Sequence, residues 1–435
     1  MEGPAALMVT VKEESQRLRL ASPSLLYSET ERDLIAALAD LLTRQAAAAD
    51  IIARTERTET YDAGLWRAVA AEIGIAGLLI PEALGGAGAS YSELAAAAEQ
   101  FGAFVAPIPY LGSAVAATAA LLSAARSAVA DGSAAGNSSA TGGRGSAGSR
   151  LVGGEPAADG PVSPAAGLLR QLAGAEITAA LAVTVTTRPG GPFPAAVRVA
   201  GRDPAAGTVR LRGTVPSVAD ALPADVLLVP AEGVPDALYL VDAAAPGVHR
   251  TPLVSLDMTR QLCDITLDDA PGRQIVVGAA AAAAVAAGLS AGAAILAAEQ
   301  LGLAQRCLDM TVAYVKERRQ FARPIGSFQA VKHRLADLWT AIALARAASR
   351  YAAACLASDD PDAAVAVALA KSACSDAAVA AAQECVQLHG GIGFTWEHPA
   401  HLYLKRAKSA AAAYGTPGAH RASLAGLVNL PAPDA

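Results

Sequence analysis

The sequence predicts an α+β fold of several domains: an N-terminal helical domain, a middle antiparallel β-domain and a C-terminal four-helix bundle. Three observations predict it. Apolar residues recur at helical spacing early in the chain, short β-branched runs occupy its middle, and long Ala-rich helical stretches fill its end. With 435 residues, 53% of them hydrophobic, the chain can build several sizeable cores. The expected domains are residues 24–180, 181–275 and 276–430.

The N-terminal domain begins at a helix-capping pattern. Ser28, followed three residues later by Glu31, precedes apolar residues such as Leu38 at helical spacing, which predicts a helix with a capping box. Further Ala-rich helices follow after a Gly-rich turn at 77–90. Residues 124–166 consist mostly of Ala, Gly and Ser, and such residues bury too little apolar surface to offset the entropy of ordering. We therefore expect a disordered surface insertion there.

The middle domain differs from its neighbours in its hydrophobic period. Between residues 181 and 270, short runs such as ALAVTVTT, TVRLRGTV and ALYLVD are rich in β-branched residues and bounded by Gly, Pro or Asp, which predicts antiparallel strands. The chain then returns to long helices, the first from about 279 to 321, the second from near 328, the third from 361 to 389 and the last from near 399. Four long helices with short connections predict an antiparallel bundle.

Charge, cysteine content and hydropathy exclude several classes of protein. The net charge is 34 − 40 = −6 and no long basic run occurs, which argues against a nucleic-acid-binding protein. Five cysteines without a CxxC pair argue against a disulfide framework or zinc cluster and favour a cytoplasmic location. Ile275–Ala298 carries no charge, but its Ala, Gly and Ser content favours a buried core helix, so no membrane partner is expected. His398 and His401 are expected to be structural, and no metal site is predicted.

Three sequence motifs resemble those of a known family. They are LLIPEALGGAGAS at 78–90, YVKERRQFARPIGSFQAVKHRLADL at 314–338 and VQLHGGIGFTWEHPAHLYLKRAK at 386–408. In this order and spacing they resemble the acyl-CoA dehydrogenase family, from about residue 26 to 428 apart from the insertion. The resemblance implies α,β-dehydrogenation of an acyl-CoA thioester, in which a carboxylate removes the α-proton while the β-hydride moves to N5 of FAD. It also implies a tetramer and an electron-transfer flavoprotein-type acceptor.

In this family each FAD lies between two subunits: one holds the flavin ring with its β-domain, and the neighbour's bundle binds the diphosphate and adenine. In this chain, the residues that would bind the diphosphate and adenine of a neighbour's FAD resemble those of the family. Arg318 matches the diphosphate arginine, whose planar fork suits paired hydrogen bonds. Gln387, Gly390 and Gly391 match the loop over the ADP moiety, where glycine lets backbone N–H groups approach phosphate. The remaining matches to cofactor contacts are Gln320, Phe321, Ile325, Gln329 and Thr416, and Ala322 stands where the family normally has Gly.

The part of the β-domain that would hold the flavin ring resembles the family less. The corresponding stretches, VTVTTRPGG at 183–191 and RGTVPSVADAL at 212–222, lack the family's carboxylate, serine and ring-stacking tryptophan. The usual catalytic glutamate also has no counterpart: Tyr414 stands before Gly415–Thr416, and the alternative position on the first bundle helix falls near Gly292. A phenol with an ordinary pKa of about 10 is a poor base at pH 7, so the catalytic residue stays unknown.

This asymmetry favours one hypothesis over three others. The chain resembles the base-lacking subunit of heteromeric, two-subunit bacterial acyl-CoA dehydrogenases that act on bulky, steroid-like acyl-CoAs. Its partner is then a second dehydrogenase-like chain in a heterotetramer, and its setting is lipid or steroid catabolism. The alternatives are a homotetrameric enzyme with a relocated base such as Glu299 or Glu397, a flavin-free scaffold subunit, and a flavin monooxygenase of the same fold.

Overall fold

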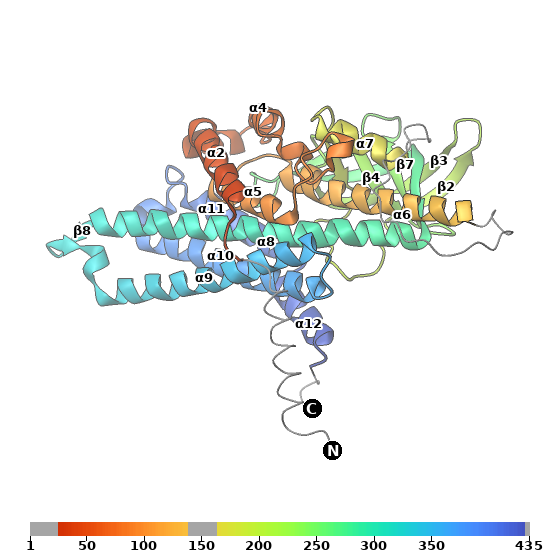
Figure 1. Ribbon diagram of the computed structural model, residues 1–435. Helices are drawn as coiled ribbons and strands as arrows, with labels where there is room; N and C mark the ends of the chain where they lie inside the picture. The colour runs from red at the N-terminus through yellow and green to blue at the C-terminus, as the bar shows by residue number, and fades with distance from the viewer. Residues whose placement is uncertain (1–24, 138–162, 431–435) are drawn as a thin grey trace, which may run out of the picture.

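The computed structural model of the chain describes residues 25–137 and 163–430. Figure 1 shows one long helix, α8 (Gly278–Glu317), running the length of the molecule, with the β-sheet at one of its ends and the short strand β8 (Arg319–Gln320) at the other. In this view the first helices of the chain lie on one side of α8, and helices α9 (Gln329–Ala357) and α12 (Pro417–Leu427) lie on the opposite side. This arrangement confirms the predicted fold class.

The N-terminal helices begin as the sequence predicts. Ser28 Oγ accepts a hydrogen bond from the Glu31 N–H at 3.1 Å, and the Glu31 carboxylate accepts one from the Ser28 N–H at 2.6 Å, which forms the predicted capping box. The buried face of this helix carries Leu38, Leu41 and Leu42. The helices of this part are α2 (Glu29–Gln45), α3 (Ala48–Thr55), α4 (Ala63–Arg67), α5 (Tyr91–Ala103), α6 (Thr118–Asn137) and α7 (Pro164–Ala173), with π-helical turns at Ala68–Glu72 and Tyr110–Ala117 and 3₁₀ turns at Ile75–Gly77 and Glu82–Leu84.

The predicted disordered insertion at 124–166 is wrong at both of its ends. Helix α6 continues to Asn137, and α7 begins at Pro164. Alanine has the highest helix propensity, and Ala124 is fully buried, so the start of this stretch has a helical preference and packing that its composition did not suggest. The prediction for 138–162 lies outside the described residues.

The middle of the chain forms a seven-stranded sheet. Its strand order is β1–β4–β5–β7–β3–β2, and β6 pairs with β7. The described pairings are antiparallel except that of β1 with β4, where Ala180 lies opposite Leu227. The prediction of an antiparallel domain therefore fails at β1, which enters from α7 and not through a hairpin. The strands are β1 (Ala179–Leu181), β2 (Val197–Asp203), β3 (Thr208–Ala219), β4 (Val226–Ala231), β5 (Ala237–Asp242), β6 (Val248–Leu253) and β7 (Leu262–Val277).

The bundle is built around α8. That helix ends at Glu317, four residues earlier than predicted, because β8 pairs with β9 (Arg323–Pro324) in a hairpin. By length and composition α8 and the segment 363–394 could cross a membrane, but 61% and 56% of their most apolar windows are buried inside the chain. Burial of this extent is typical of the core helices of a bundle. The other helices are α9 (Gln329–Ala357), α10 (Ala363–His389), α11 (Ala400–Ala412) and α12 (Pro417–Leu427), with 3₁₀ turns at Ile325–Ser327 and Gly390–Phe394.

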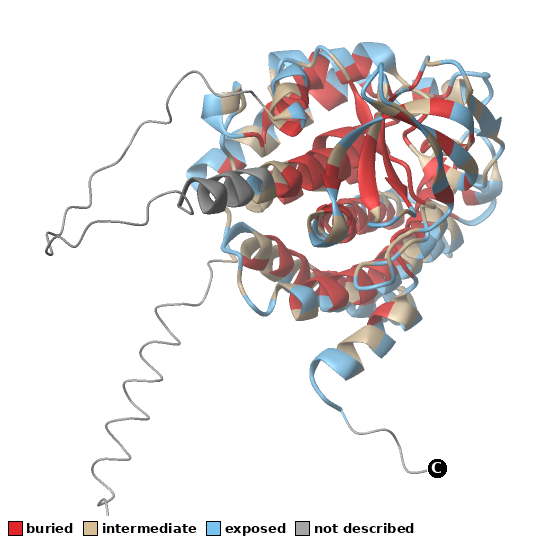
Figure 2. Cartoon of the chain, turned by 90° about the vertical axis from the view of Figure 1, so that its right-hand side faces the viewer, coloured by how far each residue is buried: buried red, intermediate tan, exposed pale blue. Residues whose placement is uncertain are grey.

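Figure 2 shows that buried residues fill the central helices and the strands beside them, whereas exposed residues lie on the outside. Residues 291–304 of α8 are all buried. Helix α5 crosses α8 so closely that a Cβ on Gly102 would lie 1.9 Å from the Glu299 carbonyl oxygen, and a Cβ on Gly302 would lie 1.8 Å from that of Glu99. Glycine at both positions therefore sets the spacing of these two helices.

Candidate functional site

The residues predicted for the site fall into two groups at different places along α8. Arg318 directly follows the end of α8 that carries β8 in Figure 1, whereas Tyr414 contacts Gly292 in the middle of the helix. The two positions are 318 − 292 = 26 residues apart, or about 39 Å at the helical rise. We call residues 318–329 and 387–391 the arm.

The first part of the arm is an exposed hairpin. Its turn residues, Phe321 and Ala322, have φ angles of 51° and 63°, as a two-residue hairpin turn requires. Ala322 therefore keeps the turn that glycine would form with less strain. The backbone after the turn is tied back, since the Ile325 N–H donates to the Arg318 carbonyl at 2.8 Å. Within the described part of the chain the Arg318 guanidinium has no hydrogen bond or ion pair, so it is free to bind an anion.

The second part of the arm is the glycine loop that ends α10. Gly390 has φ 63° and ψ −138°, a conformation that favours glycine. A Cβ on Gly390 or Gly391 would meet nothing within 4 Å, so a ligand can approach this backbone closely. The ring of His389 stacks on that of Tyr314 at 4.5 Å, which places the loop beside the last turn of α8.

The structure thus gathers most of the predicted diphosphate and adenine contacts at one end of α8. A free guanidinium and an open glycine loop at the same end of α8 fit a diphosphate. Thr416 is not part of this group: its hydroxyl caps α12 by accepting from the Ala419 N–H at 3.2 Å. The gathered residues are Arg318, Gln320, Phe321, Ile325, Gln329, Gln387, Gly390 and Gly391.

Tyr414 occupies a closed position against α8. A Cβ on Gly292 would lie 2.5 Å from both Cε1 and Cζ of the Tyr414 ring, so the ring rests on the glycine backbone. The Tyr414 N–H donates to the Val185 carbonyl at 2.7 Å, and the His420 ring donates from Nε2 to the Tyr414 carbonyl at 2.8 Å. Burial raises the pKa of the Tyr414 phenol well above its ordinary value. The side chain is therefore neutral and fixed.

The loop after β1 closes onto the bundle at the same place. Besides the contact of Val185 with Tyr414, the Arg188 guanidinium donates to Ser423 Oγ at 2.5 Å. Beside this loop lies a groove of about 680 Å³, formed by residues between 182 and 196 with Val215 and Pro230. Among its described lining residues Arg188 alone is ionisable, so the groove offers no carboxylate.

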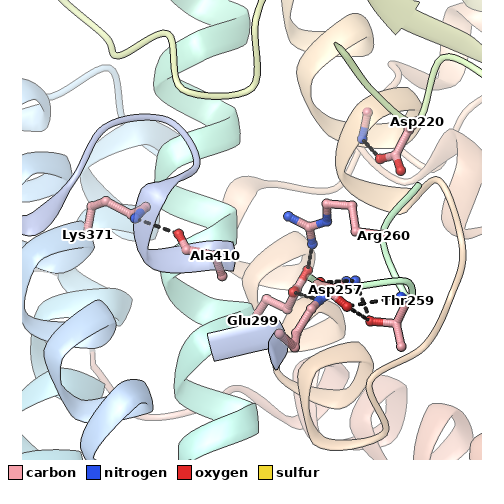
Figure 3. A network of polar contacts seen from close by, with 9 residues as sticks. Asp220, Asp257, Thr259, Arg260, Glu299, Lys371 and Ala410 are labelled. Carbon is pink, nitrogen blue, oxygen red and sulfur yellow. Dashed lines mark hydrogen bonds and ion pairs between the residues drawn. The ribbon is translucent and has the colours of Figure 1, made fainter. Parts of the chain in front are cut away.

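A buried ionic cluster surrounds Glu299, and the sequence did not predict it (Figure 3). Its charges interact electrostatically with Tyr414. Glu299 on α8 accepts hydrogen bonds from Arg260 Nη2 at 2.6 Å and from Arg406 Nε at 2.8 Å. Arg406 also donates to Thr259 Oγ1 at 3.1 Å and lies 3.6 Å from Asp257 Oδ2. Although burial opposes it, the two guanidinium groups hold the pKa of Glu299 below its ordinary value.

Two further buried groups complete this centre. Asp220 accepts a hydrogen bond from the Gly112 N–H at 2.9 Å, and burial raises the pKa of its carboxyl. Lys371 on α10 is fully buried and donates to Ser375 Oγ at 2.9 Å, to the Ala410 carbonyl at 3.0 Å and to the Gly415 carbonyl at 3.4 Å. Burial lowers the pKa of Lys371 to about 7. Lys371 thereby ties α10 to the turn that carries Tyr414, as Figure 3 shows in part.

The histidines of the WEHPAH segment have local partners. His398 Nδ1 accepts from the Ala400 N–H at 3.2 Å, and His401 Nε2 donates to the Trp396 carbonyl at 3.2 Å. Within residues 25–137 and 163–430, no group of three or more His, Cys, Asp or Glu is arranged to hold a metal ion.

Comparison with known proteins agrees with this geometry. Sequence profiles of the N-terminal and C-terminal domains of acyl-CoA dehydrogenases match residues 28–129 and 282–427. Acyl-CoA dehydrogenase IpdE2 of Mycobacterium tuberculosis is 33% identical over 374 residues, which cover 86% of this chain and 89% of the relative. Acyl-CoA dehydrogenase FadE27 of the same organism is 31% identical over 372 residues, which cover 82% and 86%.

Solved structures give the same result. The ChsE4–ChsE5 complex from Mycobacterium tuberculosis matches with a TM-score of 0.74 and 26% identity over 94% of this chain and 100% of that chain. A variant of the steroid ACAD Tcur3481–Tcur3483 matches with a TM-score of 0.72 and 27% identity over 92% and 98%. Both terminal domains and relatives above 30% identity over most of the chain therefore agree: the chain belongs to the acyl-CoA dehydrogenase family.

Proposed function

We propose that this chain is the base-lacking subunit of a heteromeric acyl-CoA dehydrogenase and is active only together with a partner subunit. Members of the family are FAD-dependent oxidoreductases that act on CH–CH bonds. When bound, FAD accepts the hydride from the β-carbon of the acyl-CoA. The arm of this chain contacts the diphosphate of an FAD whose flavin ring is held by the partner.

The position of Tyr414 is the observation that carries the proposal. The sequence resemblance implies that the family's catalytic glutamate would stand at Tyr414 or near Gly292, and the ring of Tyr414 rests on the backbone of Gly292. Because burial raises the pKa of the phenol, its ionisation at neutral pH is strongly unfavourable. The space for a base is filled by a group that cannot act as one.

A relocated base is disfavoured by the partners of the other carboxylates. Both carboxylate oxygens of Glu299 accept hydrogen bonds from arginines, and its lowered pKa makes it a weaker proton acceptor. Glu397 is exposed and follows the glycine loop of the arm, on a different segment from Tyr414. Neither carboxylate is available for the α-proton of a substrate beside Gly292.

The distance along α8 supports a shared cofactor. The arm lies at one end of the helix and the β-domain at the other (Figure 1), so the arm cannot serve a flavin held by the β-domain of its own chain. That β-domain also has no carboxylate in its groove, and its loop is bonded to the bundle through Val185 and Arg188. The diphosphate half of the site fits FAD, whereas the ring half does not.

The relatives suggest the partner and the substrate. One matched structure is a complex of two named chains, ChsE4 and ChsE5, and another is named as a steroid ACAD. We therefore propose a second acyl-CoA dehydrogenase-like chain that carries the glutamate as the partner, in a heterotetramer. The proposed substrate is a bulky, steroid-like acyl-CoA, and the proposed electron acceptor is of the electron-transfer flavoprotein type.

The test is to purify the full chain alone and together with a second acyl-CoA dehydrogenase-like chain that carries the catalytic glutamate. The proposal predicts flavin absorbance and acyl-CoA-dependent dye reduction in the complex, and neither in the lone chain. A lone chain that retains FAD and turns over an acyl-CoA would contradict the proposal. A complex that never contains FAD would favour a scaffold subunit instead.

A further inference from the structure

His389 lies between the two parts of the arm. It is the last residue of α10, is 4% exposed and directly precedes Gly390 of the glycine loop. Its ring stacks on Tyr314 with 4.5 Å between the ring centroids and 28° between the planes, and it lies 4.4 Å from the ring of His398. Nδ1 donates to the Cys385 carbonyl at 2.6 Å, since a carbonyl can only accept. These contacts fix both the place and the orientation of the imidazole.

Tyr314 in turn fixes the position of Arg318. The Arg318 N–H donates to the Tyr314 carbonyl at 2.9 Å, which closes the last turn of α8. Arg318 is thus placed relative to Tyr314, and Gly390 is placed relative to His389. The stack of the two rings therefore joins the backbone that carries Arg318 to the glycine loop.

We propose that His389 is a positioning residue of the arm, whose stack on Tyr314 sets the separation between Arg318 and the glycine loop and thereby the affinity for the FAD diphosphate. This inference rests on the proposed function, because it requires the arm to bind that diphosphate. The Arg318 guanidinium and the N–H groups of the glycine loop must both reach the same diphosphate. Hydrogen bonds weaken steeply when their distance or angle departs from the optimum. A ring that fixes both sets therefore controls affinity without touching the ligand.

The test measures the dissociation constant for FAD in the complex of the full chain with its partner subunit, by the change in FAD fluorescence. His389→Ala and Tyr314→Ala should each raise it about tenfold, the effect of losing one charge-assisted hydrogen bond. Because the two residues act as one bridge, the double variant should raise it no further than either single variant. Tyr314→Phe keeps the ring and serves as the matched control, with an unchanged dissociation constant.

His389→Phe provides a second variant in case His389→Ala does not fold. It keeps a stacking ring but loses the Nδ1 donor, so its dissociation constant for FAD should lie closer to the wild-type value than that of His389→Ala. If His389 served only to stabilise the fold, its variants would lower the melting temperature, but the double variant would not show the non-additive effect on FAD binding and phenylalanine would not rescue that binding. Additive losses in the double variant, or no rescue by phenylalanine, would overturn the inference.

Arg318→Gln separates this inference from the proposed function. If Arg318→Gln weakens FAD binding while His389→Ala leaves it unchanged, the arm binds the diphosphate but His389 does not position it. If Arg318→Gln itself leaves FAD binding unchanged, the proposed function of the arm fails, and the inference fails with it.

Discussion

Gly292→Ala probes the contact between Tyr414 and α8 most sharply. The new Cβ would lie 2.5 Å from two ring carbons and 2.9 Å from the hydroxyl oxygen, whereas carbon atoms in contact normally lie about 3.5–4.0 Å apart. The ring must therefore move by about 1 Å. It cannot do so freely, because the Tyr414 backbone is hydrogen-bonded to Val185 and His420.

The expected cost follows from two opposing effects. Overpacking a buried site costs about 3 kcal/mol at the upper end of its usual range, and replacing glycine by alanine within a helix returns about 1 kcal/mol. The net loss is about 2 kcal/mol in the free energy of unfolding, measured by urea denaturation followed by circular dichroism. Gly167→Ala in α7 is the matched control, since a Cβ there meets nothing within 4 Å, and it should stabilise the chain by about 1 kcal/mol.

A third variant links the loss to the ring itself. In a Tyr414→Leu background the clash is absent, so Gly292→Ala should no longer destabilise the chain. If Gly292→Ala stabilises the wild-type chain as much as Gly167→Ala does, the ring does not rest on Gly292 and the reasoning is refuted.

Three further predictions follow from the buried centre. Tyr414→Phe should leave the turnover of the complex unchanged, because the buried phenol stays neutral and takes no proton; a hundredfold loss, of the order expected for a removed general base, would contradict this. Glu299→Gln should destabilise the chain by about 3–5 kcal/mol in urea denaturation, since it leaves the buried Arg260 without its carboxylate and Arg406 with Asp257 alone; a neutral effect would contradict this. Lys371 has a pKa of about 7 in the folded chain, below its ordinary value of 10.5, so the unfolded chain binds more protons between these values and stability should rise with pH there. Lys371→Met should lower that slope by up to about 1.4 kcal/mol per pH unit when unfolding is measured from pH 7 to 10, and an identical slope in both proteins would be the contrary result.

Local sequence patterns predicted the local features of the fold. The capping box at Ser28 and Glu31 depends only on residues three apart, and it forms as expected. The hairpin that shortens α8 was missed because Phe321 and Ala322 are not typical turn residues, although both have positive φ. The start of the insertion was misjudged because composition alone does not reveal that Ala124 packs in a core.

The candidate site also has a part that the sequence predicted and a part that it did not. Arg318 and the glycine loop lie in long motifs, so their matches to the family could be made from the sequence. The ionic cluster could not be predicted, because Glu299 is 39 residues from Arg260 and 107 from Arg406. The three residues meet only because α11 and the segment between β6 and β7 both pack against α8. One signal was present: Glu299 is an acidic residue in an otherwise apolar buried stretch, where a charge needs a partner.

The decisive measurement is the FAD content of the two-chain complex when Arg318 of this chain, and no other residue, is changed to glutamine. We expect the wild-type complex to be yellow, the Arg318→Gln complex to assemble but lose most of its FAD, and this chain by itself to contain none. Full FAD content in the Arg318→Gln complex, or one FAD per molecule in the lone chain, would contradict the claim that the arm binds the cofactor of a partner.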